Sequence, residues 1–336
     1  MEEHKLVFII SQPRSGSTYL QNILSNNENV NTCSEPWILL NFTNFIKPEL
    51  LQATYNYKWA NLAFNDFLDK YPSIELSKRL KKVILDLYEP MAEGYDLVID
   101  KTPRYWEILE EIMELFPKSK IIILKRHPMD VAVSIIKTWK ITSLAKLSRF
   151  RRDLLLAPTV LHNFSERQLK NPRVYSLKYE DLINNKAEEV ENLYNWLGLT
   201  YTHNVLKTDK NKKYKGLYGD PFQNNLATSN TIVNQLKDKP LSKDFEDFKV
   251  GYQHYLTPEF LNEYGNYSSG KGSETPFFKK FQYYDMNLER LNSKYSHIKN
   301  SSSFKIGQLI LYPLIVLRKS INLKSKRIKC LLQLLP

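Results

Sequence analysis

The chain has 336 residues, 42% of them hydrophobic and 12% aromatic, so it can bury a sizeable core as one large or two modest globular domains. Its net charge of +12 favours anionic partners (a nucleotide, an acidic glycan, nucleic acid or a membrane surface) without choosing among them. Two cysteines exclude a disulfide framework, and no metal-site spacing is present.

The first expected element is a buried strand over residues 6–10, an apolar and β-branched run that ends at a proline-containing turn. A polar turn, residues 14–18 (Arg-Ser-Gly-Ser-Thr), leads into a predicted helix. Such a strand–turn–helix unit directs backbone N–H groups at a phosphate; Arg14 adds a full charge, and Ser17 and Thr18 add hydroxyl donors. The simpler alternative is a plain N-capped turn. The motif is not a Walker A, because no lysine follows the glycine.

Residues 13–18, together with Ser-Glu-Pro at 34–36, resemble the nucleotide-binding segment of sulfotransferases that use 3′-phosphoadenosine 5′-phosphosulfate (PAPS). The bacterial glycolipid and tyrosylprotein types are the most similar. The resemblance implies that the loop holds the 5′-phosphosulfate of the donor and that Glu35 is the catalytic base. The loop residues that correspond are Arg14, Ser15, Gly16, Ser17 and Thr18.

Residues 37–95 are expected to be helical. Over residues 76–87, apolar side chains recur at helical spacing opposite a basic face that we interpret as solvated. Four aromatic residues earlier in this segment could form the floor of an acceptor pocket, but we favour core packing for them: Tyr55, Tyr57, Trp59 and Phe64.

Three more strands are expected, at residues 97–100, 121–124 and 174–177, with helices between and after them. The run at 121–124 is so apolar that both of its faces must be covered. Strands that alternate with helices predict a parallel sheet with right-handed crossovers. We therefore predict a three-layer α/β fold of the P-loop type, with a short parallel sheet and helices on both faces.

A second motif follows the strand at 121–124. Arg126 lies at its carboxyl end, where open α/β sheets bind ligands, and Pro128 begins a helix that carries Ser134 about two turns later. An arginine and a hydroxyl together suit a terminal phosphate. The spacing resembles the second signature of the same family, which implies that Arg126 and Ser134 bind the 3′-phosphate of the donor. The alternative is a surface arginine and a helix-facing serine.

The strand at 97–100 ends in Asp100-Lys101-Thr102-Pro103, which allows two interpretations. An apolar strand that ends in aspartate is similar to a Walker B, which in a kinase would hold Mg²⁺. Alternatively, Lys101 at the strand end can place an ammonium beside the sulfuryl group, and Lys-Thr-Pro resembles the Lys-Asp-Pro of the tyrosylprotein type. We favour Lys101, because the Walker A lysine is missing; an exposed structural lysine is the remaining alternative.

Later segments resemble the family less specifically. Lys-Tyr-Glu-Asp at 178–181 resembles Arg-Tyr-Glu-Asp, which places Tyr179 near the adenosine and gives the acids structural roles. Residues 207–230 are expected to form a long loop, and its basic, glycine-bearing part at 213–221 resembles the segment that closes over the nucleotide, which implies Lys215 and Gly216 in donor binding. His127 and His162 are interpreted as packing residues, so Glu35 remains the expected base.

We expect residues 1–265 to form the catalytic domain, residues 266–276 (Asn-Tyr-Ser-Ser-Gly-Lys-Gly-Ser-Glu-Thr-Pro) a linker, and residues 277–336 a basic, apolar C-terminal extension. Within the extension, the apolar run 306–317 is broken by Pro313 and is too short to span a bilayer. It fits a helix in the headgroup region of an anionic membrane, or a terminal helix packed on the domain. The two alternatives remain open.

The sequence thus predicts an enzyme that moves a sulfuryl group from PAPS to an acceptor hydroxyl of a glycan, glycolipid or tyrosine, with Arg14, Lys101 and Glu35 as catalytic residues. A glycan or glycolipid is the favoured acceptor, and neither a metal nor nucleic acid is expected to take part. A P-loop kinase and a non-catalytic binder of anionic glycan or nucleic acid are the alternatives. Because the first expected strand begins almost at the N-terminus, no signal peptide is expected. A cytoplasmic protein is therefore predicted, with peripheral contact of the tail at the inner membrane face as an open alternative.

Overall fold

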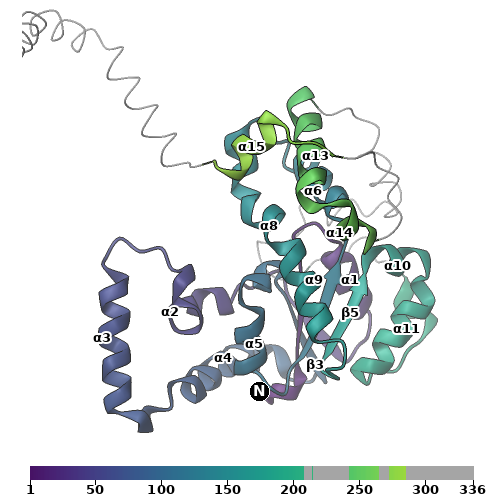
Figure 1. Cartoon of the computed structure of the whole chain (residues 1–336). Helices are drawn as coiled ribbons and strands as arrows, with labels where there is room; N and C mark the ends of the chain where they lie inside the picture. Colours follow the sequence, from purple (N-terminus) through teal and green to yellow (C-terminus); the bar gives the residue numbers. More distant parts are fainter. Residues whose placement is uncertain (208–213, 215–241, 265–271, 285–336) are drawn as a thin grey trace, which may run out of the picture. The chain divides into compact units, whose positions relative to one another are not determined.

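The computed structural model describes residues 1–207, 214, 242–264 and 272–284 (Figure 1). The chain divides into one compact unit, Met1–Gln282, and a second, Tyr283–Pro336, nearly all of which lies outside the described residues. The first unit holds a parallel sheet covered by helices, which confirms the predicted fold class. The apolar run 306–317 lies outside the described residues, so neither interpretation of the tail is tested.

Five parallel strands form the sheet in the order β2-β3-β1-β4-β5. Their bounds are β1 (Leu6–Ser11), β2 (Val30–Thr32), β3 (Leu97–Lys101), β4 (Lys120–Lys125) and β5 (Val174–Lys178). The four expected strands are all present, and β2 is an additional edge strand of three residues that pairs with β3. Since every strand runs the same way, all five carboxyl ends lie at one edge of the sheet.

The sheet is apolar on both faces because its central strands are covered on both sides. In β4, Ile121 and Ile123 belong to the hydrophobic cluster on one face, whereas Ile122 and Leu124 belong to the cluster on the other. All six residues of β1 are buried. The expectation that both faces of the 121–124 strand are covered is confirmed.

Helices from different parts of the chain cover the two faces. One face packs against α4 (Leu76–Ala92), η5 (Pro103–Ile108), α5 (Leu109–Leu115) and α9 (Ala157–Arg167). The other packs against α1 (Ser17–Leu24), α10 (Tyr179–Asn184), α11 (Lys186–Leu197) and η7 (His203–Leu206). The remaining short 3₁₀ segments are η1 (Glu3–Lys5), η2 (Leu39–Phe42), η3 (Pro48–Leu50) and η4 (Pro72–Ile74).

A third hydrophobic cluster lies among helices. They are α6 (Pro128–Thr138), α7 (Leu144–Leu147), η6 (Ser148–Phe150), α8 (Arg151–Leu155), α13 (Lys243–Leu256), α14 (Pro258–Asn262) and α15 (Pro276–Gln282). Helix α15 packs on α13, with the rings of Phe278 and Phe248 5.6 Å apart. Residues 277–282, which we assigned to the C-terminal extension, therefore lie in the first compact unit.

The insert between β2 and β3 contains an exposed aromatic helix. In α3 (Tyr57–Lys70), which follows α2 (Thr43–Ile46), no residue is buried, and the Trp59 side chain is 70% exposed. Tyr55 just before it is 57% exposed. The α3 helix extends away from the sheet in Figure 1. The favoured core packing for this aromatic group is therefore wrong, because none of its side chains is buried, although the Phe64 ring contacts Phe45 of α2 at 6.0 Å.

None of the described helices combines the length and the apolar character that crossing a membrane requires.

Candidate active site

Each of the five strands delivers one part of the expected site at the same edge of the sheet. Strand β1 leads into the turn 14–18, β2 is followed three residues later by Glu35, β3 ends at Lys101, β4 is followed by Arg126, and β5 by Tyr179. This edge is where open parallel sheets bind ligands. The topology therefore brings together residues that are up to 165 positions apart in the sequence.

The turn after β1 is shaped by two residues in the left-handed region, Arg14 at φ 75° and Gly16 at φ 91°. Helix α1 then begins at Ser17, with Gly16 in the N-cap position. A Cβ atom on Gly16 would lie 2.3 Å from Cδ2 of Tyr179, so the ring closes against the turn. Glycine is required here both for its backbone conformation and for the absence of a side chain.

Two buried donors at the turn have no hydrogen-bond partner among the described residues. They are the Ser15 hydroxyl and Nε of Arg126. The free N–H groups of the first turn of α1 point to the same end of the helix. A buried donor without a partner is costly, and an anion would satisfy such donors. The arrangement therefore fits a phosphate or sulfate group.

Arg126 and Ser134 both contact Arg14. Nη1 of Arg126 donates to the carbonyl oxygen of Arg14 at 3.0 Å, and Nε of Arg14 donates to Oγ of Ser134 at 3.5 Å. The Arg126 guanidinium also lies over the ring of Tyr179, 4.4 Å from its centroid. The two predicted phosphate-binding motifs thus form one cluster.

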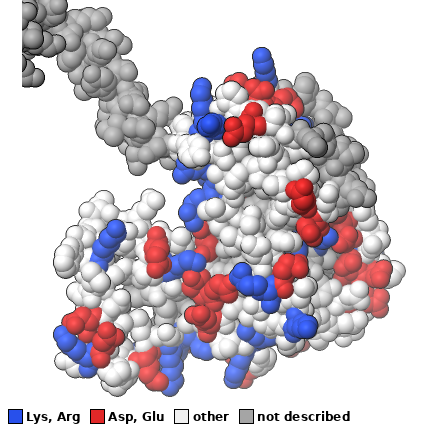
Figure 2. Space-filling model, viewed as in Figure 1, with Lys and Arg blue, Asp and Glu red and all other residues white. Residues whose placement is uncertain are grey.

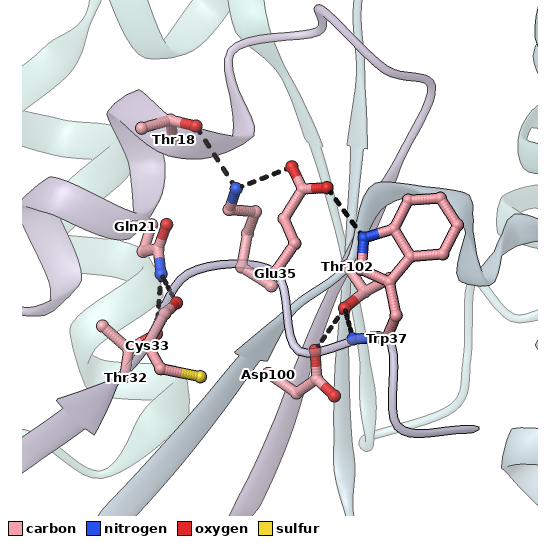
Figure 3. A network of polar contacts seen from close by, with 9 residues as sticks. Thr18, Gln21, Thr32, Cys33, Glu35, Trp37, Asp100 and Thr102 are labelled. Atoms are coloured by element: carbon pink, nitrogen blue, oxygen red, sulfur yellow. Dashed lines mark hydrogen bonds and ion pairs between the residues drawn. The ribbon is translucent and has the colours of Figure 1, made fainter. Parts of the chain in front are cut away.

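Lys101 and Glu35 form an ion pair in the middle of the site, with 2.9 Å between Nζ and Oε1 (Figure 3). The Lys101 side chain is fully buried and that of Glu35 is 18% exposed. Nζ of Lys101 also lies 3.4 Å from Oγ1 of Thr18, the last residue of the 14–18 motif and the second residue of α1. The expected base and the expected cation therefore touch each other, and the cation touches the phosphate loop.

Asp100, next to Lys101, is engaged inside the core. Its carboxyl group accepts hydrogen bonds from the hydroxyls of Tyr88, Thr102 and Tyr105, and no part of it is exposed. Burial raises the pKa of Asp100 to about 6. With its oxygens occupied by three hydroxyls, Asp100 is not placed to hold Mg²⁺ as a Walker B aspartate would. Within the described residues, no group of three or more His, Cys, Asp or Glu side chains could hold a metal ion.

The hydroxyls that bind Asp100 also hold the segment after Glu35. Oγ1 of Thr102 accepts from the backbone N–H of Trp37 at 3.4 Å, and the Tyr105 hydroxyl accepts from that of Leu39 at 3.0 Å (the first of these is drawn in Figure 3). The indole N–H of Trp37 donates to Oε2 of Glu35 at 3.2 Å. The position of Glu35 therefore depends on a hydrogen-bonded chain that starts at a buried carboxyl group.

Asp153 holds Arg104 beside the site. Nε and Nη2 of Arg104 donate to its carboxylate at distances of 2.7–3.1 Å, and the Trp106 indole donates to the same group at 3.2 Å. The side-chain amide of Gln12, next to the phosphate turn, donates to the backbone oxygen of Asp153 at 2.8 Å. Burial acts to lower the pKa of Arg104, but Asp153, and also Glu35, outweigh it and raise that pKa. Arg104 is thus fixed in place within the electrostatic reach of Glu35.

Arginine and aromatic side chains alternate between the phosphate turn and Glu35. Arg14 lies 5.6 Å from the Trp139 ring centroid, and the Trp139 and Phe150 rings are 4.7 Å apart. Arg104 lies between Phe150, at 5.9 Å, and Trp37, at 5.4 Å. We call these five residues, Arg14, Trp139, Phe150, Arg104 and Trp37, the aromatic–arginine row.

The remaining predicted residues lie at the border of the site or outside the described part. His127 caps α6 and lies edge-on to the Tyr264 ring, and its backbone N–H donates to Glu180 at 2.9 Å. His162 packs against Phe260 at 5.4 Å. Lys215 and Gly216 lie outside the described residues.

One residue next to Lys215 is described and contacts the first helix. The hydroxyl of Tyr214 donates to Oδ1 of Asn22 at 2.5 Å and lies 2.8 Å from Oγ of Ser25, both on α1. Tyr214, which belongs to the segment predicted to close over the nucleotide, therefore contacts the helix that follows the phosphate turn.

Several residues of the site were missed by reasoning from the sequence. Trp37, Trp139, Phe150, Arg104 and Asp153 come from four separate segments and carry no recognised spacing. Only Arg104 offered a signal, since it follows directly after Lys-Thr-Pro. Their proximity depends on the tertiary packing of η5, η6 and α8.

Comparison with known proteins settles the family. A family model described as "Sulfotransferase family" matches residues 7–203, more than half of the chain. The chain belongs to the sulfotransferase family. The matched range contains every described residue of the predicted site, from Arg14 to Tyr179.

Individual relatives are more distant. The nodulation protein NoeE of Sinorhizobium fredii is 30% identical over 134 residues, which is 40% of this chain and 32% of that protein. An uncharacterized protein of Aquifex aeolicus is 24% identical over 285 residues, 82% of this chain and 34% of that protein. The chain thus spans about a third of the length of these two relatives. The sulfotransferase domain from the curacin biosynthetic pathway gives a TM-score of 0.45 at 20% identity, covering 85% of this chain and 96% of that domain.

Proposed function

We propose that this sulfotransferase transfers a sulfuryl group from PAPS to a hydroxyl group of its acceptor. The observation that carries the proposal is the Lys101–Glu35 ion pair, which lies at the carboxyl end of the sheet and touches Thr18 of the phosphate turn. A cation and a carboxylate in contact, next to a site that fits an anion, supply the two charged groups that this reaction needs.

The donor is held by three groups in this proposal. The turn that contains Ser15 and Gly16 binds the 5′-phosphosulfate through its backbone N–H groups and the buried Ser15 hydroxyl. Arg126 and Ser134 bind the 3′-phosphate, for which Nε of Arg126 is a buried donor without a partner among the described residues. Tyr179, which lies between Arg126 and Gly16, contacts the adenosine.

The chemical step breaks the bond between sulfur and the bridging oxygen of the 5′-phosphate and forms a bond between sulfur and the acceptor oxygen. Glu35 takes the proton of the acceptor hydroxyl. Arg14 and Lys101 stabilise the negative charge that grows on the departing phosphate oxygen, and adenosine 3′,5′-bisphosphate leaves. As the donor binds, its anionic oxygens compete with Glu35 for Lys101, which makes the carboxylate available as a base.

For the acceptor we propose a hydroxyl of a glycan or glycolipid, in keeping with the resemblance to the glycolipid type; a tyrosine hydroxyl is the alternative within the same chemistry.

We also propose that the enzyme acts in the cytoplasm, where the donor is available, and that its C-terminal extension contacts an anionic membrane. This contact would keep the site close to a lipid-linked acceptor.

Two other functions are less well supported. A kinase would need a Mg²⁺ ligand at Asp100, whose carboxyl group is occupied by three hydroxyls. A binder of anionic polymers would need a basic surface. On the face in Figure 2, lysine and arginine are interspersed with aspartate and glutamate. Most of the net charge belongs to residues 285–336, which carry ten Lys and Arg against two Asp and Glu.

Nucleotide binding in EDTA tests the proposal. Calorimetry should show that the protein binds adenosine 3′,5′-bisphosphate more tightly than adenosine 5′-phosphate by at least about tenfold, because a charge-assisted bond to the 3′-phosphate contributes about 1.5–3 kcal/mol. Tighter binding of ATP with Mg²⁺ than of the bisphosphate would instead support the kinase. No binding of any adenine nucleotide would contradict both.

A further inference from the structure

The acceptor must reach the site along a limited set of side chains. Its reacting hydroxyl has to lie within hydrogen-bond distance of Glu35, and Trp37 already donates to the other oxygen of that carboxylate at 3.2 Å. Arg104 lies on the Trp37 ring, and its own electrostatic environment includes Glu35. The atoms of the acceptor next to the reacting hydroxyl will therefore meet Trp37 and Arg104 first.

The aromatic–arginine row continues from these two residues back to the phosphate turn. Arg104 lies between the Trp37 and Phe150 rings, Phe150 packs on Trp139, and Trp139 lies under Arg14. Trp139 is 39% exposed, and Phe150 and Trp37 are partly exposed, so the row is accessible along its length. The row extends from Arg14 in the phosphate turn, where the donor is proposed to bind, to Trp37, which contacts Glu35.

The Nη1 group of the Arg104 guanidinium is available to donate to a ligand. Its Nε and Nη2 are fixed by the carboxylate of Asp153, which is only 4% exposed, whereas Nη1 has no hydrogen bond to any described residue. The side chain is 32% exposed. A guanidinium that is held rigidly between two aromatic rings, with an NH2 group that has no acceptor among the described residues, is suited to bind a polar ligand.

We infer that the aromatic–arginine row binds a sugar ring of the acceptor, which lies along the partly exposed edges of Trp37 and Phe150 while Nη1 of Arg104 donates to one of its hydroxyls. This inference rests on the proposed function and specifies which residues of the site recognise the acceptor. A sugar presents an apolar ring face to an aromatic surface and several hydroxyls around its edge. One hydroxyl reacts at Glu35 and another satisfies Arg104.

A phenolic acceptor fits the row less well. A tyrosine side chain has a single hydroxyl, which must go to Glu35 for reaction, so it would cover Nη1 of Arg104 without offering it an acceptor. Leaving a desolvated donor unpaired costs about 1–3 kcal/mol. The alternation of arginine and aromatic groups therefore favours an acceptor with several hydroxyls over an aromatic one.

An array of neutral and acidic oligosaccharides, together with tyrosine-containing peptides, tests this inference on the full chain loaded with adenosine 3′,5′-bisphosphate. Binding to at least one oligosaccharide is expected. Phe150→Leu, which keeps an apolar side chain for packing but removes the aromatic ring and its exposed edge, should weaken that binding by about tenfold or more. The matched control, Phe67→Leu on the exposed helix α3, should bind like the wild type.

The outcomes separate this inference from the proposed function. Calorimetry of the same variants should show an unchanged affinity for adenosine 3′,5′-bisphosphate, since Phe150 is not part of the donor site. Binding of tyrosine peptides alone, or of nothing on the array, would overturn the sugar assignment even if the bisphosphate binds. Equal oligosaccharide binding by wild type, Phe150→Leu and Trp139→Leu would overturn the role of the row. Failure of the wild type to bind the bisphosphate would instead count against the proposed function.

Discussion

Lys101 and Glu35 come from neighbouring strands and meet at 2.9 Å, although 65 residues separate them in the sequence. Lys101 is the last residue of β3, and Glu35 follows the short edge strand β2. The fully buried ammonium needs a partner, because an unpaired buried charge is strongly destabilising. Before the donor binds, Glu35 is that partner. The pair therefore links the stability of the site to the availability of the proposed base, Glu35.

Glu35→Gln should lower turnover by a factor of about 10² or more, the scale of positioned acid–base catalysis. The amide keeps the size of the carboxylate and can still accept from Trp37, so the affinity for adenosine 3′,5′-bisphosphate should barely change. Steady-state kinetics and calorimetry measure the two quantities. Turnover close to that of the wild type would remove Glu35 from the mechanism.

Arg126→Ala should weaken binding of adenosine 3′,5′-bisphosphate by about 1.5–3 kcal/mol, the range for a hydrogen bond to a charged group. Binding of adenosine 5′-phosphate should change much less, because it lacks the 3′ group. Calorimetry with both nucleotides measures the difference, and Arg149→Ala, a change outside the site, provides the control. Equal losses for both nucleotides would show that Arg126 does not recognise the 3′-phosphate.

Gly16→Ala should be more destabilising than Gly94→Ala. Both glycines have positive φ angles, 91° and 78°, so both substitutions carry a conformational cost of about 1–2 kcal/mol. Only at position 16 would the new Cβ lie 2.3 Å from the Tyr179 ring; at position 94 nothing lies within 4 Å. Urea unfolding of the two variants isolates the steric contribution. Equal midpoints would mean that Tyr179 does not pack on the turn.

Asp100 should make stability depend on pH. Burial raises its pKa from 3.8 to about 6, so the folded protein binds a proton more tightly than the unfolded chain. The resulting stabilisation is fully present below pH 3.8 and is lost as the pH rises through 6. The free energy of unfolding of the wild type relative to Asp100→Asn should therefore fall by about 2–3 kcal/mol between pH 4 and pH 6.5.

Urea unfolding of both proteins across this pH range measures that difference. Because the asparagine does not titrate, it removes only the contribution of this carboxyl group, and the other ionisable groups cancel in the comparison. A difference that stays constant, or that grows in favour of the wild type as the pH rises, would contradict the assignment. Burial makes the ionised form of Asp100 unfavourable. The same carboxyl group begins the hydrogen-bonded chain that ends at Glu35.

Truncation after residue 302 tests the proposed membrane contact of the C-terminal extension. Residues 306–317 are almost wholly apolar, and Lys and Arg residues follow directly. Apolar and basic residues mixed in this way favour adsorption to anionic lipid. The full chain should sediment with anionic liposomes at low salt, and the truncated chain should not, while still binding adenosine 3′,5′-bisphosphate. Sedimentation of both, or of neither, would contradict the membrane role.

The sequence predicts the parts of this fold that rely on strong local patterns. Strands β1, β3 and β4 contain continuous apolar runs, β5 is a weaker one interrupted by Ser176, and the turn 14–18 has a recognisable composition. Strand β2 escapes prediction because it has only three residues, two of them polar, Asn31 and Thr32. Its existence depends on pairing with β3, which is a tertiary interaction.

The placement of the candidate-site residues follows from the sequence where they lie at strand ends, but not where it depends on packing between helices. Lys101 and Arg126 each follow an apolar run, so their position in the sheet follows from the order of elements. Arg104, in contrast, is placed by Asp153, 49 residues away. The aromatic residues near Trp59 look like core residues in the sequence, and only the three-dimensional arrangement shows that no residue of α3 is buried.

Transfer of labelled sulfate from PAPS, measured in EDTA with an acceptor fraction from cells of the native source, tests the central claim most directly. The wild-type chain should transfer the label to an acceptor and release adenosine 3′,5′-bisphosphate in equal amount. Lys101→Met should lose this transfer, since the cation beside the departing phosphate is gone. Transfer of labelled phosphate from ATP with Mg²⁺ but no transfer of sulfate, or full sulfate transfer by Lys101→Met, would contradict the proposed function.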